Sequence, residues 1–327
     1  MALPAAFAAR MQQIVPAPLL PQVMASFACA KPVCFWLNPL RASAGTRDEL
    51  PVLDSIAPAP TPVPWYPVPW SRGAYWVSAE QRAHLTRHPS ATAGRIYILN
   101  AASLLPVPLL RIRPGQRLLD LAAAPGGKTL QMAAALDNSG TIAAVDVVKS
   151  RFHRLRANLD RCGATCVRFF CKDGRAVGRT CPDRFDAVLL DAPCSAEARF
   201  DARDPTTWAH WSEKKLRDCH KKQVGLIASA WRSLKPGGHM VYCTCSLAPE
   251  ENECVVDALL CRFGDAVHVV ELALPVPTQP GLPQWNGRQL HPSVGKTRRV
   301  LPCETHDALY LALLKKTSHG DRIAVGR

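Results

Sequence analysis

The sequence predicts an α/β protein with a mostly parallel, doubly wound sheet and a small N-terminal domain. From about residue 115, short apolar runs rich in β-branched residues alternate with longer segments of helical character, a pattern typical of consecutive strand-helix-strand units. The 327 residues, 48% of them hydrophobic, are enough for a substantial core and about two domains. No apolar run approaches the roughly 18 residues that cross a bilayer, so we expect no membrane partner.

Local residue patterns place the individual elements. The long helix should stop at residues 235–238, because lysine and glycine suit a helix C-terminus, and the next helix should start at Pro249, which acidic residues follow. We expect helices at 129–136 and 150–163, a long helix after residue 210, and a helix at 249–263. We expect strands at 117–122, 141–147, 167–171, 185–191, 239–245, 267–274 and 308–314.

Prolines at close intervals separate the N-terminal part from the rest. Residues 51–70 read PVLDSIAPAPTPVPWYPVPW, a composition that excludes a helix and favours extended geometry. This segment is therefore expected to be a connector, either a linker or an arm that lies across the second domain. The predicted division is a domain at 1–92 that contains the connector, a domain at 93–318 and a tail at 319–327.

Charge and cysteine content indicate the environment. The net charge is +14, and such a basic protein gains from contact with polyanions, so nucleic acid is a candidate partner beside the alternative of a merely basic surface. Thirteen cysteines without scaffold-like spacing indicate reduced thiols in a cytosol-like compartment. The N-terminus lacks the charged region of a secretory signal. We therefore expect a cytoplasmic protein, and we expect a monomer.

Carboxylates and thiols follow the predicted strands. Ligands of an open parallel sheet bind beyond the carboxyl ends of its strands. A single acid there is more often a cap or turn residue, but several in register indicate a site. The side chains at these ends are Asp120 with the loop 122–128, Asp146, Asp173, Asp191 with Cys194, and Cys243 with Cys245.

The glycine loop after the first of these strands leaves two interpretations open. Residues 122–129 match the P-loop pattern at Gly127, Lys128 and Thr129 but have Ala122 at the first glycine position, so a P-loop nucleotide hydrolase stays the alternative. That alternative leaves Asp146 and the thiols unexplained. Acidic strand ends suit a cofactor with a ribose, a positive centre and no phosphate, as S-adenosylmethionine has.

The thiols indicate a particular chemistry. Carbon 5 of a pyrimidine attacks a methyl donor only after a nucleophile has added to carbon 6, and a thiolate adds reversibly. A base must then remove the carbon 5 proton so that the thiol can leave. A cysteine, an acid near the ring nitrogens and a proton acceptor are therefore the groups that a cytosine methyltransferase needs.

Three motifs carry a specific resemblance. DLAAAPGGKT, LLDAPCSAE and YCTCSLAPEEN, in this order, resemble the signature motifs of the Nop/Sun family of RNA cytosine-5 methyltransferases. Residues 97–103, the segment from His210 to Gly238 and the N-terminal LPAAFAARMQQIVP are similar to family segments too, the last to bacterial 16S ribosomal RNA members. The resemblance implies a Rossmann-like class I methyltransferase fold. Bacterial ribosomal members often carry a further C-terminal RNA-binding domain, which we expect this chain to lack.

The resemblance assigns roles to residues at the strand ends. Cys245 would be the nucleophile that adds to carbon 6, and Cys194 would assist release of the product. Asp191 and Lys128 would lie close to both base and cofactor. No metal is implied. The implied S-adenosylmethionine contacts are Ala122, Ala123, Ala124, Pro125, Gly126, Gly127, Lys128, Asp146, Asp173 and Asp191.

Other interpretations of the thiols stay open. DNA cytosine methyltransferases use a proline-cysteine as nucleophile, which would give that role to Cys194. A zinc site from Cys194, Cys243 and Cys245 is conceivable, although C-x-C is not the usual spacing and no fourth ligand is evident. Buried, inert thiols are the ordinary expectation for the remaining central cysteines. These are Cys162, Cys166, Cys171, Cys181, Cys219, Cys254 and Cys261.

The chain departs from the family pattern at several positions. Ala122 replaces a cysteine, Leu99 and Asn100 stand where glutamine and glutamate are usual, and Ala196 stands where glycine is usual. We expect these changes to leave the fold intact and to alter details of the substrate pocket and the catalytic activity.

RNA is the partner that the resemblance implies, either ribosomal RNA or tRNA, and the N-terminal domain would bind RNA or act as an accessory. A cytosine is reached only when it is unstacked, so a basic face should surround the pocket. A catalytically idle RNA-binding module stays a further alternative. Candidate phosphate contacts are Lys149, Arg151, Arg154, Arg156, Lys214, Lys215, Lys221, Lys222, Lys296, Arg298 and Arg299.

Overall fold

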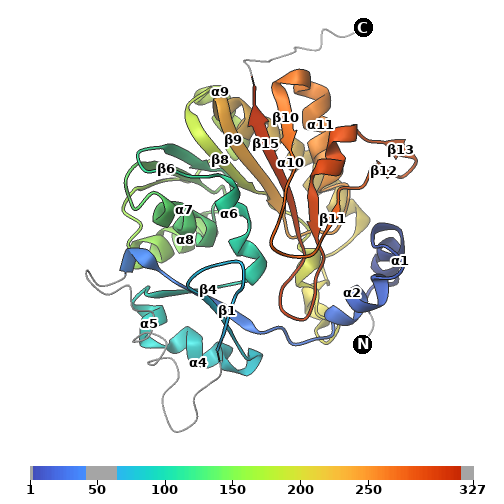
Figure 1. The fold of residues 1–327 in the computed structure, drawn as a ribbon, viewed down its shortest axis with the longest axis horizontal. Helices are drawn as coiled ribbons and strands as arrows, with labels where there is room; N and C mark the ends of the chain where they lie inside the picture. Colours follow the sequence, from blue (N-terminus) through green and yellow to red (C-terminus); the bar gives the residue numbers. More distant parts are fainter. Residues whose placement is uncertain (1–2, 42–64, 318–327) are drawn as a thin grey trace.

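The computed structural model describes residues 3–41 and 65–317, which form a large sheet with helices on both faces and a smaller sheet beside it (Figure 1). The sheet of nine strands has the order β11-β14-β15-β9-β8-β5-β6-β7, and β10 pairs with β15. Its parallel strands are β5 (Arg117–Asp120), β6 (Thr141–Val145), β7 (Val167–Phe170), β8 (Phe185–Asp191) and β9 (Leu234–Thr244). Its antiparallel strands are β10 (Val267–Val270), β11 (Thr278–Pro280), β14 (Arg298–Val300) and β15 (Leu309–Lys316).

This sheet confirms the predicted α/β class, and its strands alternate side chains between two apolar layers. Leu118 of β5 belongs to the layer under α7 (Gly127–Ala135) and α8 (Lys149–Arg161). Leu119, the next residue, packs in the layer under α10 (Glu213–Ser233) and α11 (Glu253–Phe263). Because both faces are covered, the strands are apolar on both sides, as parallel sheets require. Short helices α6 (Pro106–Leu109) and α9 (Val177–Thr180) complete this part.

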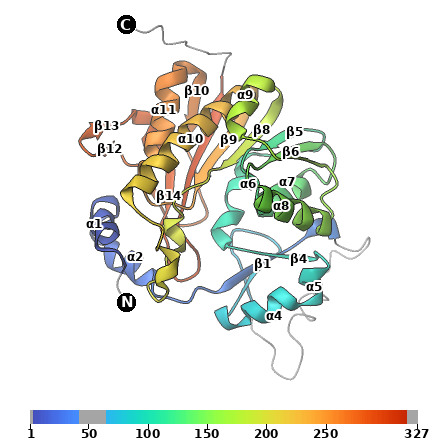
Figure 2. The ribbon, with the colours of Figure 1, turned by 180° about the vertical axis from the view of Figure 1, so that it is seen from behind.

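The N-terminal elements lie in two places. Helices α1 (Ala5–Ile14) and α2 (Leu20–Ser26) lie beside the C-terminal strands (Figures 1 and 2). Phe7 of α1 contacts Phe200 and Trp211, which precede α10. The chain then crosses to the smaller sheet, of order β2-β3-β1-β4. This sheet and its helices comprise β1 (Val33–Leu37), β2 (Tyr66–Pro67), β3 (Ala74–Val77), α4 (Arg82–Arg87), α5 (Pro89–Thr92) and β4 (Ile96–Leu99).

The expected division at residues 92 and 93 stays a prediction. Strand β4 pairs with β1 across it, since Phe35 lies opposite Ile98. The expected connector is described only from Trp65 onward, where Trp65 and Trp70 pack against Tyr75 and Trp76. Residues 51–64 and the expected tail lie outside the described residues. No helix within the described ranges is both long and apolar enough to cross a membrane.

Helix α10 ends at Ser233, directly before the predicted stop at residues 235–238, but β9 begins at Leu234 rather than at residue 239. One predicted helix boundary is wrong. Helix α11 starts at Glu253 rather than Pro249, because the side chains of Glu251 and Asn252 turn inward to bond with neighbouring loops and leave residues 249–252 as a turn. The hairpin strands β12 (Gln284–Trp285) and β13 (Arg288–Gln289) were not predicted either.

Candidate active site

The loop after β5 leaves a buried carboxylate oxygen without a partner. Thr129 donates a hydrogen bond of 2.6 Å to Oδ2 of Asp120, whereas Oδ1 of Asp120 has no hydrogen-bond partner among the described residues. Burial raises the pKa of Asp120 to about 7. The loop itself turns through Gly126, which has φ +109°, a conformation that glycine adopts at little cost. The site therefore offers one buried acceptor to a ligand donor.

The loop after β6 combines an acid with exposed apolar side chains. Asp146 is 4% exposed and accepts hydrogen bonds from the backbone of Ala124 at 3.3 Å and Val148 at 3.0 Å. Next to it, Val147 is 61% exposed and Phe170 at the end of β7 is 38% exposed. An exposed apolar patch at the end of a sheet can mark a ligand-binding groove. An apolar slot beside an acid suits a ring joined to a ribose.

Asp173 lies at the same sheet edge but differs from the other acids. It accepts from the backbone of Arg175 and forms an ion pair of 2.6 Å with the Arg175 side chain. This hydrogen bond with Arg175 lowers the pKa of Asp173. Asp173 acts in the structure as the cap of a short helical turn at Gly174–Ala176, and its predicted cofactor contact stays a prediction.

Lys128, Asp191 and Cys243 meet at the end of β8. The Lys128 ammonium lies 2.6 Å from Oδ2 of Asp191, and the Cys243 thiol donates to Oδ1 of Asp191 at 3.6 Å. Burial lowers the pKa of Lys128, but the ion pair with Asp191 outweighs it, so the pKa is raised overall. A P-loop enzyme would turn Lys128 and Thr129 toward phosphate and magnesium, whereas both are here bonded to carboxylates. Burial also raises the pKa of Cys243 well above its usual range.

Cys194 and Cys245 form a thiol pair. Their sulfur atoms are 3.4 Å apart, and both side chains are partly exposed. The hydrogen bond between the two thiols lowers the pKa of Cys245 and raises the pKa of Cys194 well above its ordinary value. Of the two thiols, Cys245 is therefore the one that loses its proton more readily. A thiolate is the reactive form of cysteine.

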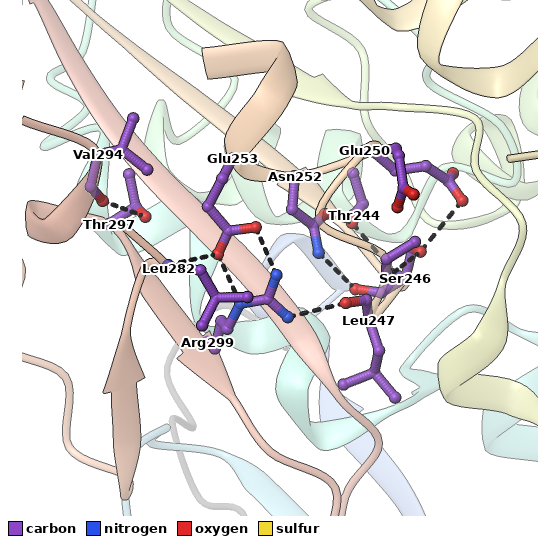
Figure 3. A network of polar contacts seen from close by, with 12 residues as sticks. Thr244, Ser246, Leu247, Glu250, Asn252, Glu253, Leu282, Val294, Thr297 and Arg299 are labelled. Atoms are coloured by element: carbon purple, nitrogen blue, oxygen red, sulfur yellow. Dashed lines mark hydrogen bonds and ion pairs between the residues drawn. The ribbon is translucent and has the colours of Figure 1, made fainter. Parts of the chain in front are cut away.

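A buried polar network holds the loop that carries Cys245 (Figure 3). Asn252 donates to the carbonyl of Ser246 at 2.8 Å and accepts from Thr244 at 2.5 Å. Arg299 pairs with Glu253 and donates to the carbonyl of Leu247 at 2.8 Å. The carbonyl groups of the consecutive residues Ser246 and Leu247 are thus fixed from the protein interior.

Arg299 is consequently not a phosphate contact, and this prediction is wrong, because the residue is 2% exposed and its charge is already paired. The other basic candidates do not form one face either. Those of α8 and those of α10 lie over opposite faces of the sheet.

Two buried carboxylates link the loops of the two thiols. Glu197 follows Cys194, and its Oε2 accepts from Ser246 at 3.1 Å and from the backbone of Leu247 at 2.9 Å. Glu251 accepts from the backbone of Ser195 at 2.9 Å and from Ser246 at 3.1 Å. Ser246 therefore bridges the two acids. Burial raises the pKa of Glu197 to about 7 and also raises the pKa of Glu251.

Two departures from the expected pattern have structural explanations. Asn100 caps the turn Ala101–Leu104, where its side chain accepts from the backbone of Ala102 at 2.9 Å. Ala196 has φ +61°, in the left-handed region that glycine prefers. The zinc interpretation finds no support, since the described residues contain no group of three or more metal-ligating side chains, and Cys243 bonds Asp191 rather than the thiol pair.

Sequence reasoning missed Arg199 and the two glutamates. Arg199 is exposed and lies close enough to the thiol pair that Cys245 raises its pKa. The only feature of the sequence that could have indicated a role for Arg199 is its position five residues after Cys194. Glu197 and Glu251 stand inside the quoted motifs, but burial against each other cannot be read from spacing.

The fold and the site together have the arrangement of the Rossmann-like class I methyltransferase fold, with a parallel sheet whose carboxyl edge presents acids and a thiol pair. The family model described as 16S rRNA methyltransferase RsmB/F matches residues 107–315, and the chain belongs to this family. The resemblance to the Nop/Sun family is thereby confirmed.

Relatives and solved structures agree with this assignment. The chain is 38% identical over 271 residues to "Ribosomal RNA small subunit methyltransferase F" of Pectobacterium atrosepticum, covering 81% of this chain and 54% of the relative. The protein of the same name from Serratia proteamaculans is 41% identical over 209 residues, which are 63% of this chain and 44% of the relative. The chain thus spans about half the length of the curated relatives it matches.

Two crystal structures from Pyrococcus horikoshii share the fold. A methyltransferase homolog has a TM-score of 0.80 and 30% identity, covering 96% of this chain and 95% of that one. NSun6 with SFG has a TM-score of 0.79 at 19% identity, covering 97% of this chain and 99% of that one, a likeness that shows the fold alone.

Proposed function

We propose that this protein transfers a methyl group from S-adenosylmethionine to carbon 5 of a cytosine in RNA, with ribosomal RNA as the substrate. The observation that carries the proposal is the thiol pair, whose sulfur atoms lie 3.4 Å apart and in which the pKa of Cys245 is lowered while that of Cys194 is raised. This polarity supports Cys245 as the nucleophile rather than Cys194, which the alternative based on DNA cytosine methyltransferases requires.

The residues of the sheet edge fit the cofactor. The free Oδ1 of Asp120 can accept a hydrogen bond from an ammonium group, and the short loop 122–128 lets a ligand approach its backbone. Asp146 and the exposed Val147 suit a ribose and an adenine ring. Bound S-adenosylmethionine would supply a methyl group on a positively charged sulfur. Residues 122–128, Asp146, Asp173 and Asp191 are the proposed contacts.

The chain's own residues would carry the remaining steps. Cys245 adds through its sulfur to carbon 6 of the cytosine, which makes carbon 5 nucleophilic. Asp191, held by Lys128 at 2.6 Å, orients the ring through its nitrogen atoms. After methyl transfer a basic group takes the proton from carbon 5, the electron pair of that bond re-forms the double bond between carbon 5 and carbon 6, and the Cys245 sulfur leaves as a thiolate. Cys194, 3.4 Å from that sulfur, assists this release.

RNA as the substrate is supported by the printed names of the relatives and by the net charge of +14. Several of the basic residues that we expected to bind phosphate are exposed, and we propose that these bind the RNA backbone. These are Lys149, Arg151, Arg154, Arg156, Lys214, Lys221 and Lys222.

The test compares wild type with Cys245→Ala and Cys194→Ala, using labelled S-adenosylmethionine with 16S ribosomal RNA, assembled small subunits or tRNA. Methylated cytosine is identified by nuclease digestion and mass spectrometry. We expect label with wild type alone, and a covalent protein-RNA adduct on denaturing gels with Cys194→Ala. Cys171 and Cys261 are exposed, so the expectation that they are buried is wrong for these two thiols. Cys261→Ser, on α11, is therefore the matched control and should keep full activity.

Each outcome is informative. Label on tRNA alone would show that tRNA and not ribosomal RNA is the substrate. Undiminished labelling by Cys245→Ala would show that another residue is the nucleophile. A wild type that binds RNA but labels none of these substrates would favour the idle binding module.

A further inference from the structure

The turn after Cys194 is attached to the backbone of Cys245. Ala196 bends the chain with φ +61°, and the backbone nitrogen of Arg199 donates to the carbonyl of Ala196 at 2.9 Å. The backbone nitrogen of Ala198 donates to the carbonyl of Cys245 at 3.0 Å. Arg199 therefore directly follows Ala198, the residue whose backbone is bonded to Cys245.

Nearby side chains restrict where Arg199 can lie. Glu197 is fully buried and accepts from the indole of Trp211 at 2.8 Å. Phe200 is 3% exposed, and its ring centroid lies 4.9 Å from that of Phe7. With both of these residues anchored in the interior, Arg199 is left as the exposed member of the turn.

The charges around Cys245 require a cation. Asp191 disfavours a thiolate nearby, and the ammonium of Lys128 is already paired with Asp191 at 2.6 Å. Among the described residues, the Arg199 guanidinium has no ion pair of its own. Its charge is consequently available to the thiol pair.

We propose that Arg199 is a positioning residue that holds Cys245 in the thiolate form through its charge. The inference rests on the proposed function, in which Cys245 is the nucleophile. After the hydrogen bond from Cys194, Arg199 is the strongest influence that lowers the pKa of Cys245, ahead of Lys128. In return, Cys245 is the first cause of the raised pKa of Arg199. The effect is reciprocal, as linkage between two charges demands.

The test measures how fast iodoacetamide alkylates Cys245 as the pH is varied, read by mass spectrometry with fragment spectra that separate Cys245 from Cys243. Loss of the neighbouring charge in Arg199→Ala should raise the apparent pKa of Cys245 by about one pH unit, so that the pH profile of alkylation moves toward higher pH by about the same amount. Arg199→Lys should stay close to wild type. Arg203→Ala, which removes an exposed arginine paired with Asp201 on the same loop, is the matched control.

Thermal unfolding of each variant shows whether it is folded, and Arg199→Lys keeps the comparison possible if Arg199→Ala is not. Superimposable alkylation profiles for wild type and Arg199→Ala would overturn the proposal. In methyl transfer, Arg199→Ala should lower kcat at pH 7, with recovery toward pH 9 and little change in KM for RNA. If Arg199→Ala changed only the KM for RNA, Arg199 would be a phosphate contact, and this result would also overturn the proposal. Alkylation needs neither RNA nor methyl donor, so it still decides the matter if the proposed function fails.

Discussion

Replacement of Glu197 by glutamine should remove a large part of the pH dependence of stability. The Glu197 carboxyl is fully buried, and burial raises its pKa from 4.5 to about 7 in the folded protein. The folded state therefore binds more protons than the unfolded chain between these two values. The stability from this group is fully present below pH 4.5 and is lost as the pH rises through about 7.

The magnitude follows from the size of the pKa difference. Each pKa unit corresponds to about 1.4 kcal/mol, so wild type should lose about 2 to 3 kcal/mol of unfolding free energy from Glu197 between pH 5 and pH 8. Glutamine has no such proton, and the Glu197→Gln variant should lack this part of the slope. Asp120, whose pKa burial also raises, contributes in the same direction but is common to both proteins.

The assay is urea unfolding under reducing conditions at intervals from pH 5 to pH 8. Glu213→Gln, which changes an exposed carboxylate in the first turn of α10, is the matched control and should follow wild type. A difference between wild type and Glu197→Gln that stays constant across this range would refute the reasoning.

Three further outcomes are expected. Ala196→Gly should raise the unfolding free energy by about 0.5 to 1 kcal/mol, because glycine relieves the left-handed strain at φ +61°; an unchanged urea midpoint would show the strain to be negligible. Glu253→Ala should lower it by about 3 to 5 kcal/mol, since Arg299 is left charged and buried, whereas exchanging both partners for apolar residues should restore most of the loss. Hydrogen peroxide should join Cys194 and Cys245, 3.4 Å apart, in a disulfide, with two thiols and one peroxide giving one disulfide and two waters. The mass falls by two hydrogens, dithiothreitol reverses the change, and a Cys194→Ser protein should show neither.

Short apolar runs that alternate with helical segments were sufficient to predict the α/β class and the parallel strands, because continuous apolar runs and the helical period of 3.6 residues are local properties of the chain. The acids and thiols at the strand ends could also be predicted, since parallel strands bring their carboxyl ends to one edge. The start of α11 could not, because it depends on Glu251 reaching Ser195, 56 residues away.

The electrostatic roles depended on contacts that no local pattern contains. The sequence shows Cys194 and Cys245 alike, and only their 3.4 Å approach shifts their pKa values in opposite directions. Arg299 shows the same limit, since an arginine near the C-terminus is read as a surface charge until Glu253 buries it. Burial and pairing arise between residues far apart in the chain, and they set whether a charge reaches solvent or stabilises the interior.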